Sequence, residues 1–349
     1  MFVYNEKYKS RKEGYYYSCA WIEHGIVFFP QKLAFCCHCG HLGGGNTLIR
    51  NNFSGQKINW EHFNKTKQMF RNFHKKGKIN SSCIDCPFLE YKKWGEENFI
   101  ENLYISHWTY CNSKCIYCYE RQNPEEFASN SNYKVLPIIK ELHETGMLRA
   151  GGKIYFGGGE PCMLDEFEDL ITYFLDNFYW GIRVHSSGIK YSPAMARAIE
   201  EVRGYMIVSV DSGSREVYKK IKQVDCYDKV RDNIRKYALK TNFKGRYLVS
   251  AKYIIIPGIN DNKEEIEKWL QANYDAGIWT TALDVEENWY REHRNNIPEY
   301  IFDIIKYAKK RSDKLNTNFE MYERLENMLQ DEYKKNKRHI VKLKPLKAI

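Results

Sequence analysis

Three cysteines in the segment YCNSKCIYCYE, residues 110–120, lie close enough in the chain to bind one metal centre. Cys111, Cys115 and Cys118 follow one another at spacings of four and three residues. Thiolates this close together can hold three corners of a [4Fe–4S] cube, which leaves the fourth iron open to another ligand. A zinc site would need a fourth Cys or His, and His107 stands four residues upstream. The residues of this segment therefore leave an iron–sulfur cluster and zinc both open.

A glycine-rich turn, YFGGGEP at residues 155–161, is the second candidate for chemistry. Gly158 and Gly159 carry no side chain, so a ligand can approach the backbone closely at this point. Glu160 adds a carboxylate, which can accept hydrogen bonds from an amine. We expect the turn at the end of a strand, next to the loop of the three cysteines.

A second group of cysteines precedes residue 90 and comprises Cys19, Cys36, Cys37, Cys39, Cys83 and Cys86. The pair Cys83 and Cys86 forms a C-x-x-C knuckle, whose two sulfurs can reach one metal centre. Together with Cys19 and either Cys36 or Cys37, this knuckle offers four thiolates. Four thiolates suit zinc or a second [4Fe–4S] cluster, and the count does not distinguish the two.

Short apolar runs alternate with helical patterns from residue 101 onward. We predict strands at residues 102–106, 153–156, 181–187, 205–210, 247–256 and 278–285. Between them, residues 133–147 have apolar side chains at helical spacing, and Ser192-Pro193 is typical of a helix start. Strands that alternate with helices favour parallel pairing with right-handed crossovers. The expected fold class is α/β, a partial (β/α)6 TIM-like barrel behind an N-terminal cysteine-rich metal-binding extension. Its functional groups are expected at the carboxyl ends of the strands.

Beyond residue 297 the sequence predicts helices only. An apolar stripe there fits core packing and comprises Phe319, Tyr322, Leu325, Met328 and Leu329. The predicted domains are a cysteine-rich region at residues 1–100, the barrel at 101–296, C-terminal helices at 297–334 and a basic tail at 335–349.

Composition narrows the class of protein. The chain has 349 residues, of which 43% are hydrophobic and 28% charged, as expected for a folded protein. No apolar run approaches the ~18 residues of a membrane helix, and the N-terminus lacks the apolar core of a signal peptide. We therefore expect a cytoplasmic protein with no membrane contact, whose eleven cysteines are thiols or metal ligands.

Charge is concentrated at the two ends of a chain whose net charge is +10. Residues 333–349 hold seven Lys and Arg and no Asp or Glu. Such a tail is typical of a solvated end, and alternatively it could contact an acidic peptide or nucleic acid.

Residues 101–290 resemble the radical S-adenosylmethionine (SAM) superfamily in the order of their motifs. The segment CNSKCIYC resembles its CxxxCxxC motif, and GGEP at residues 158–161 resembles its second-strand motif. The segments HSSG (185–188), VSVDSGSREVYKKI (208–221) and KYIIIPGIND (252–261) resemble its third, fourth and fifth strands with their loops.

The resemblance implies that SAM is the missing fourth ligand, bound through its methionine amine and carboxylate to the open iron. An electron then cleaves SAM, and a 5′-deoxyadenosyl radical abstracts hydrogen from a substrate. By this resemblance the residues expected to bind SAM are Tyr117, Gly158, Gly159, Glu160, Ser187, Ser209 and Lys252. Glu160 and the two glycines would hold the amine, and Tyr117 would pack on adenine. Ser187 or Ser209 would bond the ribose, and Lys252 would face the carboxylate.

The cysteine-rich front resembles the SPASM or twitch auxiliary-cluster domains of radical SAM enzymes, although those domains usually follow the barrel. This resemblance implies an auxiliary [4Fe–4S] cluster, with Cys19, Cys36, Cys37, Cys83 and Cys86 as candidate ligands. It favours a peptide or protein side chain as substrate, and a flavodoxin- or ferredoxin-type reductant as partner.

Two other functions stay open from the sequence. The first is a radical SAM dehydrogenase or epimerase that acts on a sugar or another small molecule. The second is a non-enzymatic zinc module that binds nucleic acid, which the strand order and the GGEP segment oppose. Nucleic acid is therefore not the expected partner.

Overall fold

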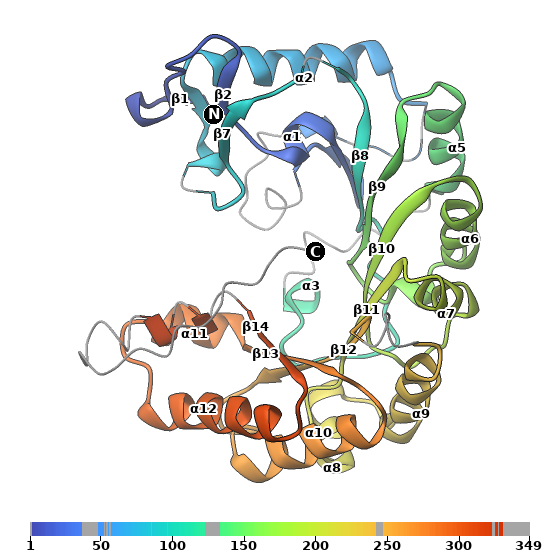
Figure 1. Ribbon diagram of the computed structural model, residues 1–349, viewed down its shortest axis with the longest axis vertical. Coiled ribbons are helices and arrows are strands. Elements are labelled where there is room, and N and C mark those ends of the chain that lie inside the picture. Colours follow the sequence, from blue (N-terminus) through green and yellow to red (C-terminus); the bar gives the residue numbers. More distant parts are fainter. Residues whose placement is uncertain are drawn as a thin grey trace. The chain divides into compact units, whose positions relative to one another are not determined.

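The computed structural model describes residues 2–36, 48–51, 53, 55, 57–84, 86–95, 97–122, 133–241, 247–322, 325–326 and 328–330. The chain divides into two compact units (Figure 1). The first unit comprises Met1–Tyr110 and Asn123–Arg183, and the second comprises Cys111–Gln122 and Val184–Ile349. The predicted domain boundaries remain predictions, and the basic tail at 335–349 lies outside the described residues.

The sheet of the first unit has parallel strands at its centre. Its strands, in order, are β5 (Leu48–Asn51), β4 (Lys32–Ala34), β3 (Gly25–Phe29), β8 (Ile100–Ile105), β9 (Leu148–Phe156) and the start of β10 (Tyr179–Ser186). Strand β8 pairs in parallel with both β3 and β9, whereas β4 pairs antiparallel with β3 and β5. Helices α5 (Leu136–Glu144) and α6 (Phe167–Asn177) lie on one side of β8 and β9 (Figure 1). Both helices bury an apolar stripe, as their helical spacing requires.

In the second unit, the strands after β10 pair in parallel with one another, in the order β11 (Gly204–Ser209), β12 (Val249–Ile255), β13 (Thr280–Val285) and β14 (Asn318–Met321). Its helices are α3 (Tyr119–Gln122), α7 (Pro193–Glu200), α8 (Arg215–Lys222), α9 (Tyr227–Ala238), α10 (Lys263–Asp275), α11 (Glu287–His293) and α12 (Glu299–Lys314). Helices α9, α10 and α12 lie along the outside of these strands (Figure 1).

The predicted fold class is confirmed. All six predicted strands are present as β8 to β13, and the chain is α/β with a largely parallel sheet typical of a partial barrel. Strand β13 is buried along its whole length, which explains why its sequence has no polar alternation. The predicted helix start is also confirmed, because the Ser192 side chain accepts the N–H of Met195 and caps α7.

The prediction of helices only beyond residue 297 is wrong for residues 318–321. After α12, these residues form β14, which pairs in parallel with β13. The N–H of Asn318 donates to the carbonyl of Trp279 at 2.8 Å, and that of Tyr322 donates to Leu283 at 3.0 Å. A strand of four residues gives little periodic signal, so its pairing partner decides its conformation. Leu325 and Met328 are nevertheless buried, as predicted.

The front of the first unit is a small module around helices α1 (Ala20–His24) and α2 (Trp60–Lys75). Two short antiparallel ladders belong to it. Strand β1 (Phe2–Tyr4) pairs with β6 (Lys78–Asn80), and β2 (Tyr15–Ser18) pairs with β7 (Glu90–Lys93). Helix α1 leads directly into β3, so the front and the barrel strands share one sheet.

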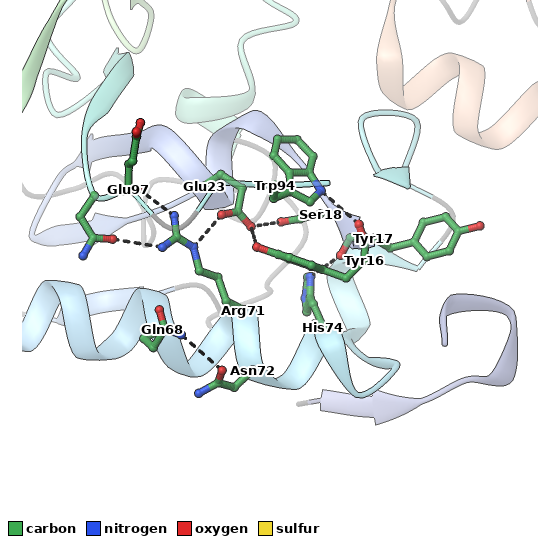
Figure 2. Close-up of polar contacts among 11 residues, drawn as sticks. Tyr16, Tyr17, Ser18, Glu23, Gln68, Arg71, Asn72, His74, Trp94 and Glu97 are labelled. Atoms are coloured by element: carbon green, nitrogen blue, oxygen red, sulfur yellow. Dashed lines mark hydrogen bonds and ion pairs between the residues drawn. The ribbon is translucent and has the colours of Figure 1, made fainter. Parts of the chain in front are cut away.

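A buried carboxylate joins α1 to α2 and to β2 (Figure 2). Glu23 is fully buried, and one of its oxygens accepts the hydroxyls of Ser18 at 2.6 Å and Tyr16 at 3.1 Å. Its other oxygen accepts Nε–H of Arg71 at 2.6 Å, and only 1% of Arg71 is exposed. Because each charge is both paired and hydrogen-bonded, the cost of burying the ion pair is offset.

The rest of Arg71 ties α2 to the segment before β8. Its guanidinium donates to the side chain of Asn98 and to the carbonyl of Glu97, both at 3.1 Å. Nearby, Nδ1 of His74 lies 3.0 Å from the carbonyl of Tyr17 (Figure 2). Burial lowers the pKa of His74 to about 4, so this histidine is neutral at pH 7 and donates from Nδ1.

We expect Arg71→Met to lower the free energy of unfolding by about 3–5 kcal/mol, because it leaves the Glu23 carboxylate buried and unpaired. Lys65→Met is the control on the same helix, since Lys65 pairs with Glu61 on the exposed surface. Urea unfolding followed by circular dichroism measures both variants. Equal, small losses in both would contradict a structural role for the buried pair.

Candidate functional site

The cysteines of the CxxxCxxC motif lie on one loop of the second unit, between the end of β8 and helix α3. The side chains of Cys111, Cys115 and Cys118 are all partly exposed. The N–H of Ser113 points at Sγ of Cys111 at 3.4 Å, and the N–H of Cys118 donates to the carbonyl of Cys115 at 3.2 Å. An N–H directed at sulfur stabilises a thiolate, which is the form that binds metal. We call residues 111–118 the cysteine loop.

The end of helix α8 holds the middle of the cysteine loop. The N–H of Lys114 donates to the carbonyl of Lys222 at 2.9 Å, and the N–H of Ile116 donates to that of Ile221 at 3.0 Å. Carbonyl groups at the end of a helix have no partner within the helix, so they are available to fix a neighbouring segment.

Ser187 fixes the cysteine loop from a second side. Its hydroxyl donates to the side-chain oxygen of Asn112 at 3.0 Å. Asn112 stands next to Cys111, so the end of β10 positions the first ligand candidate. The predicted ribose contact of Ser187 stays a prediction, and its observed partner belongs to the loop.

Three thiols on one short loop are the donor set that a [4Fe–4S] cube with one open iron requires. Among the described residues, no group of three or more His, Cys, Asp or Glu is arranged to hold one metal ion. A cube does not require the sulfurs to meet at one ion, because each thiolate binds its own iron and the sulfurs surround the whole cluster. Burial raises the pKa of the Cys118 thiol, so a bound metal is what would keep it as a thiolate at neutral pH.

The ring and the hydroxyl of Tyr117 both contact buried residues. The ring packs against a buried cluster of Ile221, Ile254 and Ile256. The hydroxyl donates to the carboxylate of Asp211. Packing on adenine therefore stays a prediction for this residue, and its observed neighbours are apolar side chains.

Ser209 and Lys252 are direct neighbours on strands β11 and β12, as the parallel register pairs them. The ammonium of Lys252 lies 3.1 Å from the carboxylate of Asp284 and 4.0 Å from the ring centre of Tyr322. Asp284 is fully buried. A SAM carboxylate at Lys252 would therefore share the ammonium with Asp284, a partner that sequence patterns did not reveal.

The glycine segment, residues 157–160, follows β9 in the first unit. Its N–H groups bond the segment after β8, with Gly159 donating to the carbonyl of Trp108 at 2.6 Å and Glu160 to that of Tyr110 at 2.9 Å. A Cβ on Gly158 would lie 2.5 Å from the carbonyl oxygen of Trp108, and one on Gly159 only 2.3 Å from that of Tyr110. Gly158 also has φ +84°, which disfavours any side chain. These glycines thus allow two backbone segments to approach each other.

Glu160 caps the short 3₁₀ helix at Pro161–Met163. Its carboxylate accepts the N–H of Cys162 at 3.2 Å, and only 1% of the residue is exposed. Cys162 is buried as well, as expected for a small apolar side chain. The turn therefore presents a buried carboxylate that is already oriented by the main chain.

Two antiparallel pairings in the first unit determine where the front cysteines lie. Strand β2 ends at Ser18, opposite Glu90 of β7, so Cys19 and the Cys83–Cys86 knuckle lie at the same end of that ladder. Strand β4 runs back along β3, so Cys36 returns toward the start of β3 and the end of α1.

The environment of Cys19 is consistent with this arrangement. Burial raises its pKa to about 12, and the nearby thiol of Cys86 adds to the rise. Cys36 and Cys83 are buried, and Cys86 is partly exposed. The remaining candidate, Cys37, lies outside the described residues, as does Cys39.

His107, the alternative zinc ligand, is buried in the first unit. Its ring stacks on Tyr133 at 4.8 Å, and its Nε2 lies 3.9 Å from the carboxylate of Glu166. Burial lowers its pKa to about 4.

Two residues near the cysteine loop were not predicted to have a role. Asp211 lies in the quoted S-x-D segment, and Lys222 stands at the end of the helix that follows it. Both are buried and form an ion pair. One sequence feature could have indicated a role for Lys222. It lies beside the apolar stripe of Tyr218 and Ile221 on α8, and a lysine is unusual on such a buried face.

Comparison with known families identifies what the middle of the chain is similar to. Residues 105–270, slightly less than half of the chain, match the family model described as the radical SAM superfamily. This similarity implies a [4Fe–4S] cluster and SAM as cofactors. The search of curated proteins finds no match to this chain.

Several solved structures are similar in fold to this chain. Streptococcus suis SuiB bound to S-adenosylmethionine matches with a TM-score of 0.47 and 11% identity, over 81% of this chain and 57% of SuiB. Native anSMEcpe with bound AdoMet matches with a TM-score of 0.47 and 15% identity, over 63% of each chain. A radical SAM methyltransferase from Sphaerobacter thermophilus matches with a TM-score of 0.39 and 17% identity, over 61% of this chain and 63% of that one. This chain thus spans less than two thirds of each of those chains.

No helix among the described residues of this chain has both the length and the apolar character needed to span a bilayer.

We expect Gly159→Ala to weaken SAM binding at least about tenfold. The added Cβ meets the Tyr110 carbonyl and must push apart the segments after β8 and β9. Equilibrium dialysis with SAM on the reconstituted protein measures the dissociation constant, and thermal melting checks the fold.

Gly151→Ala, within the preceding strand β9, is the control, because its Cβ would meet nothing closer than a carbonyl oxygen at 3.6 Å. If both variants bind SAM as the wild type does, the glycine segment has no part in the SAM site.

Proposed function

We propose that this chain is a radical SAM enzyme that abstracts hydrogen from a peptide or protein side chain, with a cluster bound by Cys111, Cys115 and Cys118. The observation that carries the proposal is the presence of these three thiols, and no fourth, on one fixed loop after the first barrel strand. With SAM bound, the reduced cluster supplies a 5′-deoxyadenosyl radical for this abstraction.

The chain's own residues have distinct tasks in this proposal. The cysteine loop provides three thiolates, and the Ser113 N–H stabilises one of them. The main-chain bonds to Ile221 and Lys222 keep the loop in place while the cofactor binds. These tasks need no movement of the loop relative to helix α8.

We assign the contacts with SAM to residues selected by the resemblance to the radical SAM superfamily. The Gly158–Glu160 segment would receive the methionine amine, for which Glu160 offers an oriented carboxylate. Ser209 would bond the ribose, and Lys252 would attract the carboxylate of SAM. Because Asp284 also binds Lys252, we expect Asp284 to hold the ammonium in position in the absence of SAM.

An auxiliary [4Fe–4S] cluster in the front of the first unit is the second part of the proposal. Its proposed ligands are Cys19, Cys36, Cys83 and Cys86, with Cys37 as an alternative to Cys36. The β2–β7 ladder and the β3–β4 hairpin support this choice, because they bring these distant cysteines toward α1.

The most specific part of the proposal is that the substrate is a peptide. It rests on the resemblance of the front to auxiliary-cluster domains, and on basic chain ends that would attract an acidic peptide. Among the fold neighbours, SuiB has been solved with its precursor peptide SuiA, and anSMEcpe with a Kp18Cys peptide. The reductant would be a flavodoxin- or ferredoxin-type protein.

Cys115→Ala is expected to abolish 5′-deoxyadenosine formation from SAM with dithionite, because two thiolates do not retain the cluster. Anaerobic purification, iron analysis and chromatography of the product measure the effect. The matched control is Cys226→Ala, a partly exposed cysteine outside both groups. A wild-type protein that binds zinc and lacks absorbance near ~400 nm would contradict the proposal.

The same assay tests the substrate class. Deuterium that passes from a labelled acidic peptide into 5′-deoxyadenosine supports the peptide proposal. Transfer from a labelled sugar nucleotide, and none from peptides, would favour the small-molecule alternative.

Cys83→Ala is expected to halve the iron content, from about eight to about four atoms per chain, and to leave reductive cleavage of SAM in place. The physical reason is that the two cysteine groups belong to separate clusters. Iron and zinc are measured together, so that a zinc site in the front is recognised. An unchanged iron content of about four in both proteins would contradict the auxiliary cluster.

A further inference from the structure

A buried ammonium group lies directly behind the cysteine loop. Lys222 is 1% exposed, and its partner Asp211 is fully buried. The ammonium donates to the carboxylate of Asp211, and to the hydroxyl of Tyr117 at 2.7 Å. Tyr117 in turn donates to the same carboxylate. Since Tyr117 stands next to Cys118 in the sequence, this triad is part of the loop's own support.

Asp211 is itself held rigidly. It has φ +60°, a conformation that residues with a side chain adopt rarely. Its second carboxylate oxygen accepts the N–H of Ile254 at 2.8 Å, and its carbonyl accepts the side-chain amide of Asn260 at 2.8 Å. A strained residue kept in place by several bonds is characteristic of functional sites. The carboxylate therefore gives Lys222 a fixed anchor at the end of β11.

Lys222 supports the cysteine loop through its main chain as well. Helix α8 ends at this residue because Gln223 takes a left-handed conformation. The carbonyls of Ile221 and Lys222 are thereby turned to the loop, where they accept the N–H groups of Ile116 and Lys114. One residue thus fixes the loop by its carbonyl and by its side chain.

The charge of Lys222 persists despite its burial. Burial alone would lower its pKa, but the carboxylate of Asp211 raises the pKa above its ordinary value. A positive charge is consequently present behind the cysteine loop at neutral pH, next to the hydroxyl of Tyr117. No exposed lysine of the same helix shares this position.

We propose that Lys222 is a positioning residue for the radical SAM cluster, which fixes the cysteine loop through Asp211 and Tyr117 and places one buried positive charge directly behind that loop. The inference rests on the proposed function, because it takes the cysteine loop as the segment that binds the cluster. A nearby cation stabilises the additional negative charge of the reduced cluster, so it raises the reduction potential. Lys222 therefore makes the cluster easier to reduce by its protein partner.

Three variants test this role. Lys222→Met removes the charge at nearly constant length, Lys222→Arg retains it, and Lys220→Met is the control on the exposed face of α8. In Lys222→Met we expect the midpoint potential of the reconstituted cluster to become more negative, with wild-type potentials in the other two. Spectroelectrochemistry under anaerobic conditions measures this shift. A wild-type potential in Lys222→Met overturns the electrostatic role.

A second measurement does not depend on the cluster. Hydrogen–deuterium exchange of residues 111–122 in the full-length apoprotein should become at least about tenfold faster in Lys222→Met, because the triad no longer holds the loop. Lys220→Met should exchange at the wild-type rate. Unchanged exchange in Lys222→Met overturns the positioning role, even where this variant fails to bind a cluster.

The two proposals fail in different ways. A wild-type protein without a [4Fe–4S] cluster refutes the proposed function. A wild-type protein with a cluster, and a Lys222→Met variant with the same potential and exchange rates, refutes only the role of Lys222.

Discussion

The cysteine loop depends on the few carbonyl groups at which helix α8 ends. A loop with three thiols has no secondary structure of its own, so its conformation is set by whatever accepts its N–H groups. Here Ile221 and Lys222 accept them, since Gln223 stops the helix one residue later. The ion pair of Lys222 with Asp211 then prevents the helix end from shifting. The conformation of the cysteine loop therefore depends both on where helix α8 ends and on the buried ion pair that holds this helix end.

In the first unit a comparable constraint comes from glycine. The segments that follow β8 and β9 are bonded at distances that leave no room for a Cβ on Gly158 or Gly159. The close approach of the two segments thus accounts for both glycines. Glu160 contributes its charge from a buried and already capped position.

In the front of the first unit the cysteines are far apart in the chain, so strand pairing rather than spacing in the sequence determines where they lie. Short antiparallel pairings bring Cys19 toward Cys86 and return Cys36 to the start of β3. Such short ladders have little stability alone, and the buried Glu23–Arg71 pair supports them by joining α1, α2 and β2. Cys19 is the N-cap residue of α1, so this ion pair also helps to fix the position of one candidate ligand.

Local patterns in the sequence determined the six barrel strands, the α/β class and the three-cysteine motif, because periodicity and spacing are properties of neighbouring residues. Tertiary structure alone decided three other features. Strand β14 exists because β13 offers it an edge, and β3 extends the sheet by pairing with a strand far along the chain. The hydroxyl of Tyr117 meets Asp211 and Lys222 across separations of 94 and 105 residues. A hydrogen bond between such distant residues leaves no trace in local sequence, so only the folded chain reveals it.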